Sequence, residues 1–435
     1  MNNKLENIFN KNHKRLRRIK NLEFALRGGE YHFVEIKDNI IINSSTKNDY
    51  YLSVRGEYKK NYFSFNSTFK DDLFDIIKLN QNIKNHNLIK YPFLKPINYR
   101  DNNTLEINFD EYNNLLLLDT ISKYIFDFLS KKCIINGRIY IKKGRISPFN
   151  NAYPIISIVN SKGINAHHKQ NKIVLNLEIK KNDNIITINK IFNNIKEIKN
   201  YLEQKNNDIQ EKLNLKTLKN YTINNDKIIF SSLSIAKILH KIKNNFSSTD
   251  YFENEFNIFR NNLNKKIFSH KINIQSTPYH PLLAIAPFDE IGEEKTIVNI
   301  IRNGKLRELT ASYYESIKYK IPLTGDTFLD TKNSRILSLY LKGSNIKLES
   351  ILNNNSNIIY IDNLNILQDI KSLNQKFKIN AKNSSYIYKK GKINKKIKSL
   401  ELNISLQELF MSVVELTEEQ EELGMITPEI LISLS

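Results

Sequence analysis

The sequence contains a single cysteine, Cys133, among 435 residues. One thiol cannot form an intramolecular disulfide, a cysteine-based zinc site or a Cys-x-x-Cys redox motif. Its neighbours Ile134 and Ile135 favour a buried structural thiol over a reactive nucleophile. The scarcity of cysteine indicates a reducing compartment, and we expect a cytoplasmic protein.

Long apolar runs are also missing. The longest short run, residues 115–118, is followed by Asp119, whereas a membrane-spanning helix needs roughly 18 or more apolar residues. The amino terminus lacks the apolar core of a secretion signal. We therefore expect no membrane association.

Acidic residues are scarce relative to basic ones. The chain has 45 Asp and Glu against 66 Lys and Arg, a net charge of +21, which alone would suggest a nucleic-acid partner. Tryptophan is absent and only 12 residues are glycine, as expected under A+T-rich codon bias, and this bias also explains much of the lysine. The 22 Tyr and 23 Phe are scattered rather than gathered beside arginines on one predicted sheet. Nucleic-acid binding is therefore the alternative hypothesis and not the preferred one.

The first half of the chain predicts helices and antiparallel strands. Apolar residues at helical spacing predict a helix over residues 4–26, ended by Gly28 and Gly29. The basic residues between Lys14 and Lys20 are interpreted as its solvated face. Alternating or apolar runs predict strands at residues 31–36, 49–57, 61–66, 137–143, 155–160 and 173–179, with a turn at 160–163. Further helices are predicted at residues 71–85 and 114–130, and a polar connector helix at 190–218.

The second half is predicted to be richer in strands. A strand at 227–230 and a helix at 234–244 precede an irregular, proline-containing segment. Asn303 and Gly304 predict the two-residue turn of a β-hairpin over residues 296–309. Further predictions are strands at 335–341, 358–361 and 386–388, a helix or strand at 406–416, an acidic loop at 418–422 and a last strand at 429–434.

Length and composition predict a packed protein of two domains. The hydrophobic fraction of 40% is sufficient for a folded core. We place the boundary near Tyr221, at the end of the connector helix, which gives an N-terminal domain 1–221 and a C-terminal domain 222–435. The predicted fold class is α+β, with a mixed or antiparallel sheet and packed helices in each domain.

Residue chemistry alone reveals no catalytic constellation. No histidine pair has the spacing of a helical zinc motif, and satisfied or exposed side chains are the better interpretation of all eight, His13, His32, His86, His167, His168, His240, His270 and His280. Carboxylates at residues 289–294 lack the alternate spacing of a calcium loop and are interpreted as a solvated turn. Phosphate-binding loops, a nucleophile elbow and a dinucleotide fingerprint are all absent.

The order of several short segments adds information. Together they resemble the TldD/PmbA family, in which metallopeptidase subunits pair with non-catalytic PmbA (TldE) partners. The similarity extends over nearly the whole chain, and the matching segments are 26–36 (LRGGEYHFVEI), 158–163 (IVNSKG), 287–292 (PFDEIG), 301–306 (IRNGKL), 324–325 (TG), 339–344 (LYLKGS) and 427–432 (TPEILI).

The resemblance implies where a zinc site would lie. Active members carry His-Glu-x-x-x-His on the first helix of the C-terminal domain, and a cysteine near the C-terminus. Here His240 matches the first ligand, but Lys241 replaces the glutamate, Asn245 replaces the second histidine, and no cysteine follows Cys133. One imidazole cannot hold zinc, and lysine cannot activate water as a general base. The resemblance thus points to the PmbA/TldE branch, with no cofactor bound by this chain and zinc in the partner.

The expected role is that of a partner subunit. It would assemble with a TldD-type catalytic subunit and bind unfolded peptides or peptide precursors, by adding a strand to a sheet edge. We expect the last strand, 429–434, and the hairpin 296–309 to supply an apolar interface. The alternatives are a nucleic-acid-binding protein and an active metallopeptidase with unrecognised ligands.

Overall fold

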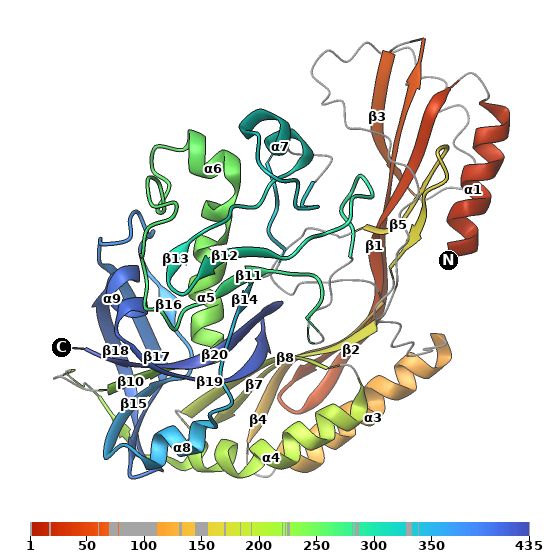
Figure 1. Cartoon of the computed structure of the whole chain (residues 1–435). Helices are drawn as coiled ribbons and strands as arrows, with labels where there is room; N and C mark the ends of the chain where they lie inside the picture. Colours follow the sequence, from red (N-terminus) through yellow and green to blue (C-terminus); the bar gives the residue numbers. More distant parts are fainter. Residues whose placement is uncertain are drawn as a thin grey trace.

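The structure is a computed structural model with two large β-sheets and nine described α-helices or short helical segments around them (Figure 1). It describes residues 2–16, 19–59, 61–68, 77, 111–129, 133–143, 155–168, 171–182, 184–192, 194–219, 221, 223, 227–280, 282, 287–327, 333–337 and 339–434. The α+β class predicted from the sequence is confirmed. The predicted helix at 71–85 lies outside the described residues, apart from the helical Ile77.

The first sheet is antiparallel throughout its described pairs. Its order is β3-β2-β1-β4-β7-β8, while β5 pairs with β1 and β6 pairs with β5. The strands are β1 (Lys20–Lys37), β2 (Ile40–Tyr58), β3 (Asn61–Thr68), β4 (Ile134–Lys143), β5 (Ile155–Asn160), β6 (Asn165–His167), β7 (Asn171–Lys181) and β8 (Asn184–Phe192). The predicted strands of this half are therefore confirmed, as is the turn after Asn160.

Helices cover one face of this sheet at two separate places (Figure 1). Leu22, Phe24 and Leu26 of β1 share a core with α1 (Asn2–Arg15). Val34 and Ile36, farther along the same strand, share another with α3 (Glu111–Leu129) and α4 (Ile195–Asn214). All five positions are even-numbered, and a strand places alternate side chains on one face. One long strand therefore joins two helical layers.

The predicted helix over residues 4–26 is wrong in its second half, because α1 ends at Arg15 and β1 begins at Lys20. Apolar residues at 19, 22 and 26 fit a helical period, yet Leu22, Phe24 and Leu26 fit a period of two equally well. Gly28, which was expected to end the helix, lies inside β1 with a φ of 120°.

The connector helix also begins later than predicted. α4 starts at Ile195, because residues up to Phe192 form the edge strand β8. Its N-cap is Asn194, whose side chain accepts a hydrogen bond from the backbone of Glu197. The domain boundary near Tyr221 stays a prediction.

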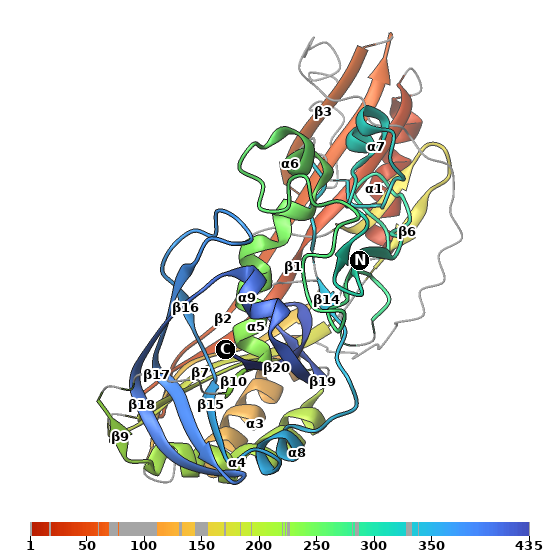
Figure 2. The same ribbon diagram turned by 60° about the vertical axis from the view of Figure 1, so that its left-hand side comes forward.

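The second sheet is mixed, and most of it belongs to the C-terminal half (Figure 2). Its order is β13-β12-β11-β14-β20-β10-β15-β17-β18-β9, with β16 beside β17 and β19 beside β20. The strands are β9 (Thr217–Leu218), β10 (Lys227–Phe230), β11 (Ile274–Ser276), β12 (Val298–Arg302), β13 (Lys305–Leu306), β14 (Tyr340–Leu341), β15 (Asn357–Ile361), β16 (Asn365–Ile366), β17 (Phe377–Lys389), β18 (Lys392–Ile404), β19 (Val413–Glu422) and β20 (Met425–Ser433). The accompanying helices are α5 (Ser232–Ile242), the 3₁₀ helix η1 (Lys243–Phe246), α6 (Ser248–Glu253), α7 (Tyr313–Tyr319), α8 (Leu348–Asn353) and α9 (Leu406–Met411).

One prediction for the C-terminal end is wrong. The acidic residues 418–422 continue strand β19 and do not form a loop. The last strand, β20, pairs with β10, β14 and β19, and its residues Ile430, Leu431 and Ile432 are almost fully buried. Val298, Ile300 and Ile301 of the hairpin are buried as well. Most of their apolar surface is therefore used inside the chain, whereas Ile297 of the hairpin is 50% exposed. The role of these segments as an interface stays a prediction.

The predicted hairpin around Asn303 is confirmed. Asn303 and Gly304 join β12 to β13, and both have positive φ angles, 50° and 72°, as a two-residue type I′ turn requires. Leu423 and Gly424 join β19 to β20 with φ angles of 59° and 75°. The two turns have the same backbone form but different surroundings. A Cβ at Gly304 would lie 2.1 Å from the backbone oxygen of Phe268, whereas one at Gly424 would meet nothing within 4 Å.

This contrast predicts the stability of two matched variants. Gly424→Ala should lower the free energy of unfolding by about 1–2 kcal/mol, the cost of a left-handed alanine. Gly304→Ala should cost about 1–3 kcal/mol more, because the backbone at Phe268 must also move. Thermal and urea unfolding of both purified variants would measure this. Equal midpoints for the two variants would contradict the close packing at Gly304.

Candidate functional site

The first candidate site is the end of helix α5, where the sequence places the degenerate zinc motif. The helix begins at the N-cap Ser231, whose side chain accepts a hydrogen bond from the backbone of Ser234. His240 is half-buried near its C-terminal end. Burial, followed by the neighbouring charge of Lys243, lowers the pKa of His240 to about 4. Its imidazole is therefore neutral at pH 7.

Lys241 is engaged at the surface. Its side chain is 47% exposed and lies 2.7 Å from Asp369, measured from Nζ to Oδ1. The hydrogen bond and the charge of Lys241 lower the pKa of Asp369. Solvent screens an exposed ion pair of this kind, so it adds little to stability.

Asn245 has a structural role in the turn that follows. It lies in η1, where its Oδ1 accepts a hydrogen bond from the backbone of Ile258 at 3.2 Å. Its own backbone oxygen accepts one from Asn257 at 2.8 Å. The side chain thus ties α5 to the loop after α6. Within the described ranges, no three His, Cys, Asp or Glu side chains are grouped closely enough to hold a metal ion.

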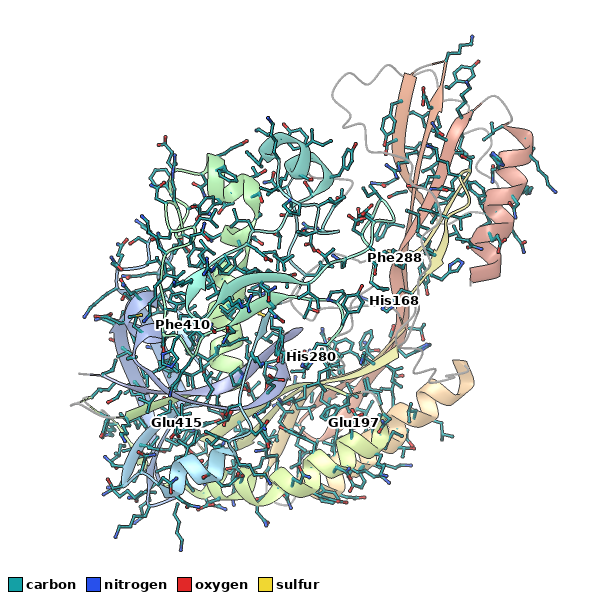
Figure 3. All side chains as sticks on the ribbon, viewed as in Figure 1. His168, Glu197, His280, Phe288, Phe410 and Glu415 are labelled. Atoms are coloured by element: carbon teal, nitrogen blue, oxygen red, sulfur yellow. The ribbon has the colours of Figure 1, made fainter. Side chains whose placement is uncertain are left out.

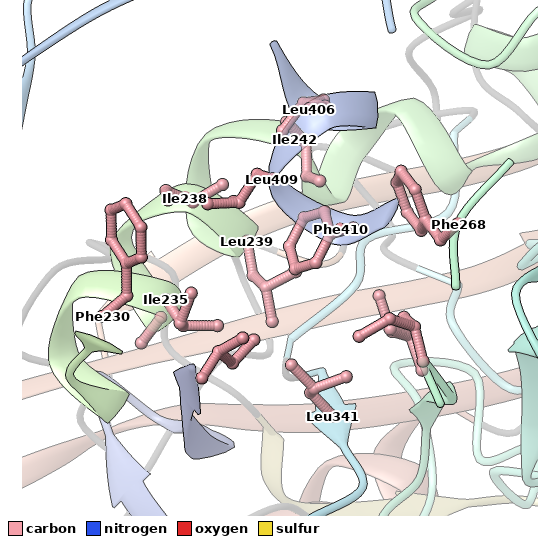
Figure 4. Packing of buried hydrophobic residues seen from close by; sticks show 14 of the residues in the cluster. Phe230, Ile235, Ile238, Leu239, Ile242, Phe268, Leu341, Leu406, Leu409 and Phe410 are labelled. Carbon is pink, nitrogen blue, oxygen red and sulfur yellow. The ribbon is translucent and has the colours of Figure 1, made fainter. Parts of the chain in front are cut away.

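The contact between α5 and the C-terminal helix α9 is apolar (Figure 4). Ile238, Leu239 and Ile242 share a core with Leu406, Leu409 and Phe410. The ring of Phe410 also lies 4.8 Å from that of Phe268, measured between centroids. The space between the two helices is therefore filled by packed side chains.

The carboxylates at 289–294 are not a solvated turn, which corrects the interpretation from the sequence. Asp289 and Glu290 are buried. Asp289 accepts hydrogen bonds from the backbones of Ile291, Glu293 and Thr327, and burial, which those bonds oppose, raises its pKa to about 6. The adjacent Phe288 packs against β1 and β5 of the first sheet (Figure 3). This segment joins the two halves of the molecule.

Cys133, His168 and His280 have structural surroundings, and His86 lies outside the described residues. Cys133 is buried, and burial raises its pKa, which confirms the structural interpretation of this thiol. His168 is buried beside β6, whereas His270 is exposed. His280 has its Nε2 3.4 Å from Oε2 of Glu419.

The second candidate site is a cavity of about 460 Å³ between the two halves of the molecule. Strand β8 and helix α4 line it from the first half, and β15, β17, β19 and β20 contribute residues from the second. Amides and hydroxyls are frequent in its lining, and the residues that carry its chemistry are Lys190, Tyr201, Lys212, Tyr360, Asp362, Glu422 and Glu429.

Two of the four lysines that line the cavity are paired with carboxylates. Lys190 forms an ion pair with Glu422. Lys212 lies 3.1 Å from Asp208 and 4.0 Å from Asp362. Burial opposes the charge of Lys212, but these carboxylates outweigh it and raise the pKa well above its usual value. Both lysines are therefore charged.

Glu429 is different, because it has no cationic partner within ion-pairing distance among the described residues. Its Oε1 accepts a hydrogen bond from the Tyr360 hydroxyl at 2.6 Å, and its Oε2 is buried without a partner in the described chain. Burial raises the pKa of Glu429 to about 7, although Tyr360, Lys205 and Lys212 oppose the shift. Sequence reasoning missed this site, because its residues come from separate elements and share no motif.

The raised pKa of Glu429 predicts a pH-dependent stability difference. Between pH 4.5 and pH 7 the folded chain keeps a proton on Glu429 that the unfolded chain has released, so the free energy of unfolding falls as pH rises. Glu429→Gln cannot ionise, and its amide oxygen can still accept a hydrogen bond from Tyr360. The variant therefore lacks this pH-dependent loss of stability. Relative to the parent, the variant should therefore gain up to about 3 kcal/mol between pH 4 and pH 8. Urea unfolding across this range would measure it.

The exposed Glu418 offers the control, because Glu418→Gln makes the same replacement of an acid by an amide on the neighbouring strand β19. A pH-independent difference between the parent and Glu429→Gln would contradict the burial of this carboxyl.

Comparison with known proteins identifies the C-terminal half. Residues 224–434 match the family described as the PmbA/TldA metallopeptidase C-terminal domain. None of the curated proteins compared with the chain matches it.

Solved structures match over nearly the whole chain. TldE from Thermococcus kodakarensis has a TM-score of 0.73 and 18% identity, and the alignment covers 99% of this chain and 98% of that one. A proposed modulator of a DNA gyrase from Thermotoga maritima has a TM-score of 0.78 and 13% identity, with 99% and 98% covered. A similar protein from Bacteroides thetaiotaomicron has a TM-score of 0.73 and 12% identity, with 98% and 97% covered. The fold over the whole chain agrees with the family match, and the C-terminal half, residues 224–434, belongs to the PmbA/TldD metallopeptidase family.

Proposed function

We propose that this chain is a non-catalytic, TldE-like subunit of a heteromeric zinc metallopeptidase that binds and helps to process unfolded peptides or peptide precursors. The observation that carries the proposal is the engagement of Lys241 and Asn245 in structural contacts, with Asp369 and Ile258 respectively. These positions match a general base and a zinc ligand in the active branch.

The chemistry of a catalytic zinc supports this proposal. Such a site needs three protein ligands and an open position for water. His240 could supply one nitrogen, but an asparagine amide is a poor zinc ligand and a charged lysine cannot accept a proton from water. The apolar contact between α5 and α9 offers no further ligand.

The partner and the substrate follow from the family. A TldD-type catalytic subunit would hold the zinc, and this chain would contribute alignment and enclosure of the peptide. The likeness to TldE from Thermococcus kodakarensis supports this branch through the fold alone.

Co-expression with a TldD-type chain from the same organism tests the assembly. We expect a stable complex that cleaves unfolded peptides, weak or no activity of the TldD-type chain alone, and about one zinc per complex. This chain alone should contain no stoichiometric zinc by elemental analysis and should cleave nothing.

A TldD-type chain whose own His-Glu-x-x-x-His motif is disrupted provides the control. Its complex should form and remain inactive. Chelator-sensitive cleavage by that complex, or by this chain alone, would show that this chain is itself an active metallopeptidase. Lack of any association would overturn the partnership.

One observation favours the alternative of nucleic-acid binding. The tip of the β17–β18 hairpin carries exposed lysines at positions 389, 390, 392 and 395, and two proteins of similar fold are proposed modulators of DNA gyrase. Such a cluster attracts phosphates without reading sequence.

We therefore expect weak, non-specific binding to duplex DNA that is lost near physiological salt. Fluorescence anisotropy of labelled duplexes across a salt series would measure it. Sequence-selective binding at nanomolar concentrations in physiological salt would instead favour a nucleic-acid-binding function, since specific contacts add several kcal/mol to counterion release.

A further inference from the structure

The edge of strand β8 lies along the cavity between the two halves. Six consecutive residues, 185–190, line it. Successive side chains of a strand point to opposite faces, so a cavity that touches consecutive residues runs along the strand's edge, where the backbone is reached. β8 pairs with β7 only, and its other edge has no backbone partner among the described residues.

The geometry suits an extended chain. Six residues of a strand extend over about 20 Å, and β8 lies beside β19 without pairing with it (Figure 1). Lys190 connects the two strands through its ion pair with Glu422. Side chains that can hydrogen-bond to a peptide surround the space, namely Asn363, Asn365, Asn380, Asn383, Ser384 and Gln420.

The lining holds four lysines and four carboxylates. Lys190 and Lys212 already have carboxylate partners, and the ammonium of Lys212 also lies over the rings of Tyr360 and Tyr386. The other two lysines, Lys205 and Lys382, are exposed. The groups that act on Glu429 electrostatically are Lys205, Lys212 and Asp362. Its Oε2 nevertheless remains buried and unpaired in the described chain. A buried carboxylate oxygen of this kind accepts most favourably from a cationic donor.

We propose that the cavity binds an extended peptide whose backbone pairs with the free edge of β8 and whose single lysine or arginine side chain reaches Glu429. Backbone pairing supplies affinity for varied sequences, and the carboxylate supplies the preference for a basic residue. This inference deepens the proposed function by naming the substrate class, but the site lies within this one chain.

Fluorescence anisotropy with labelled five-residue peptides tests the site on the isolated chain. A peptide with lysine flanked by alanines should bind saturably. Replacing the lysine by norleucine or glutamate, or substituting Glu429→Gln, should weaken binding about tenfold or more. N-methylation of alternate backbone nitrogens should weaken it as well, because methylated amides cannot donate to β8.

Glu418→Gln serves as the matched control and should bind the lysine peptide like the parent. Because the norleucine and glutamate peptides are compared on the unmodified chain, instability of Glu429→Gln cannot obscure the result. Equal affinity for the three peptides would overturn the role of Glu429, and tight binding of butylamine or of the N-methylated peptide would overturn pairing with β8. Association with a TldD-type subunit is a separate measurement, so either proposal can fail alone.

Discussion

The pairing of β1 with β2 is the constraint on which the rest of the structure depends. These antiparallel strands of 18 and 19 residues extend for about 60 Å at the usual rise per residue. Because side chains alternate, one face of β1 directs the even-numbered apolar residues between Leu22 and Ile36 towards the helices. The opposite face carries Glu23, which forms a buried ion pair with Arg55, and Ala25, which packs near Phe288. A shift by one residue would exchange the two sets.

The two halves of the molecule meet through contacts of different character. Phe288 and Gly292 pack against Ile158 and Ile164 in an apolar contact. Around the cavity, the contact consists of lysines, carboxylates and tyrosines instead. Buried charges of this kind add little net stability, since desolvation offsets their attraction. The same side chains line the cavity, which makes it the stronger candidate for a binding site.

Helix α5 is held in place by its apolar side chains and not by its polar positions. Seven of its residues are buried, and they pack against α9 and the second sheet, so the helix is needed for folding whatever its polar positions do. Lys241 forms an ion pair with Asp369, and Asn245 accepts a hydrogen bond from the backbone of Ile258.

Local features of the sequence determined the α+β class, helix α3, the turn at Asn303 and Gly304, and the absence of a complete zinc motif, because periodicity, positive φ and ligand identity act over a few neighbouring residues. Residues 20–26 could not be assigned, since their apolar positions satisfy both helical and strand periods until β2 and β5 pair with them. The acidic residues up to Glu422 were misassigned for a related reason. Glu422 is accommodated in a buried strand by Lys190, which is 232 positions away. Only the tertiary structure brings Lys190, Glu422 and Glu429 around one cavity, because burial and pairing of charges depend on contacts between distant segments and leave no local pattern.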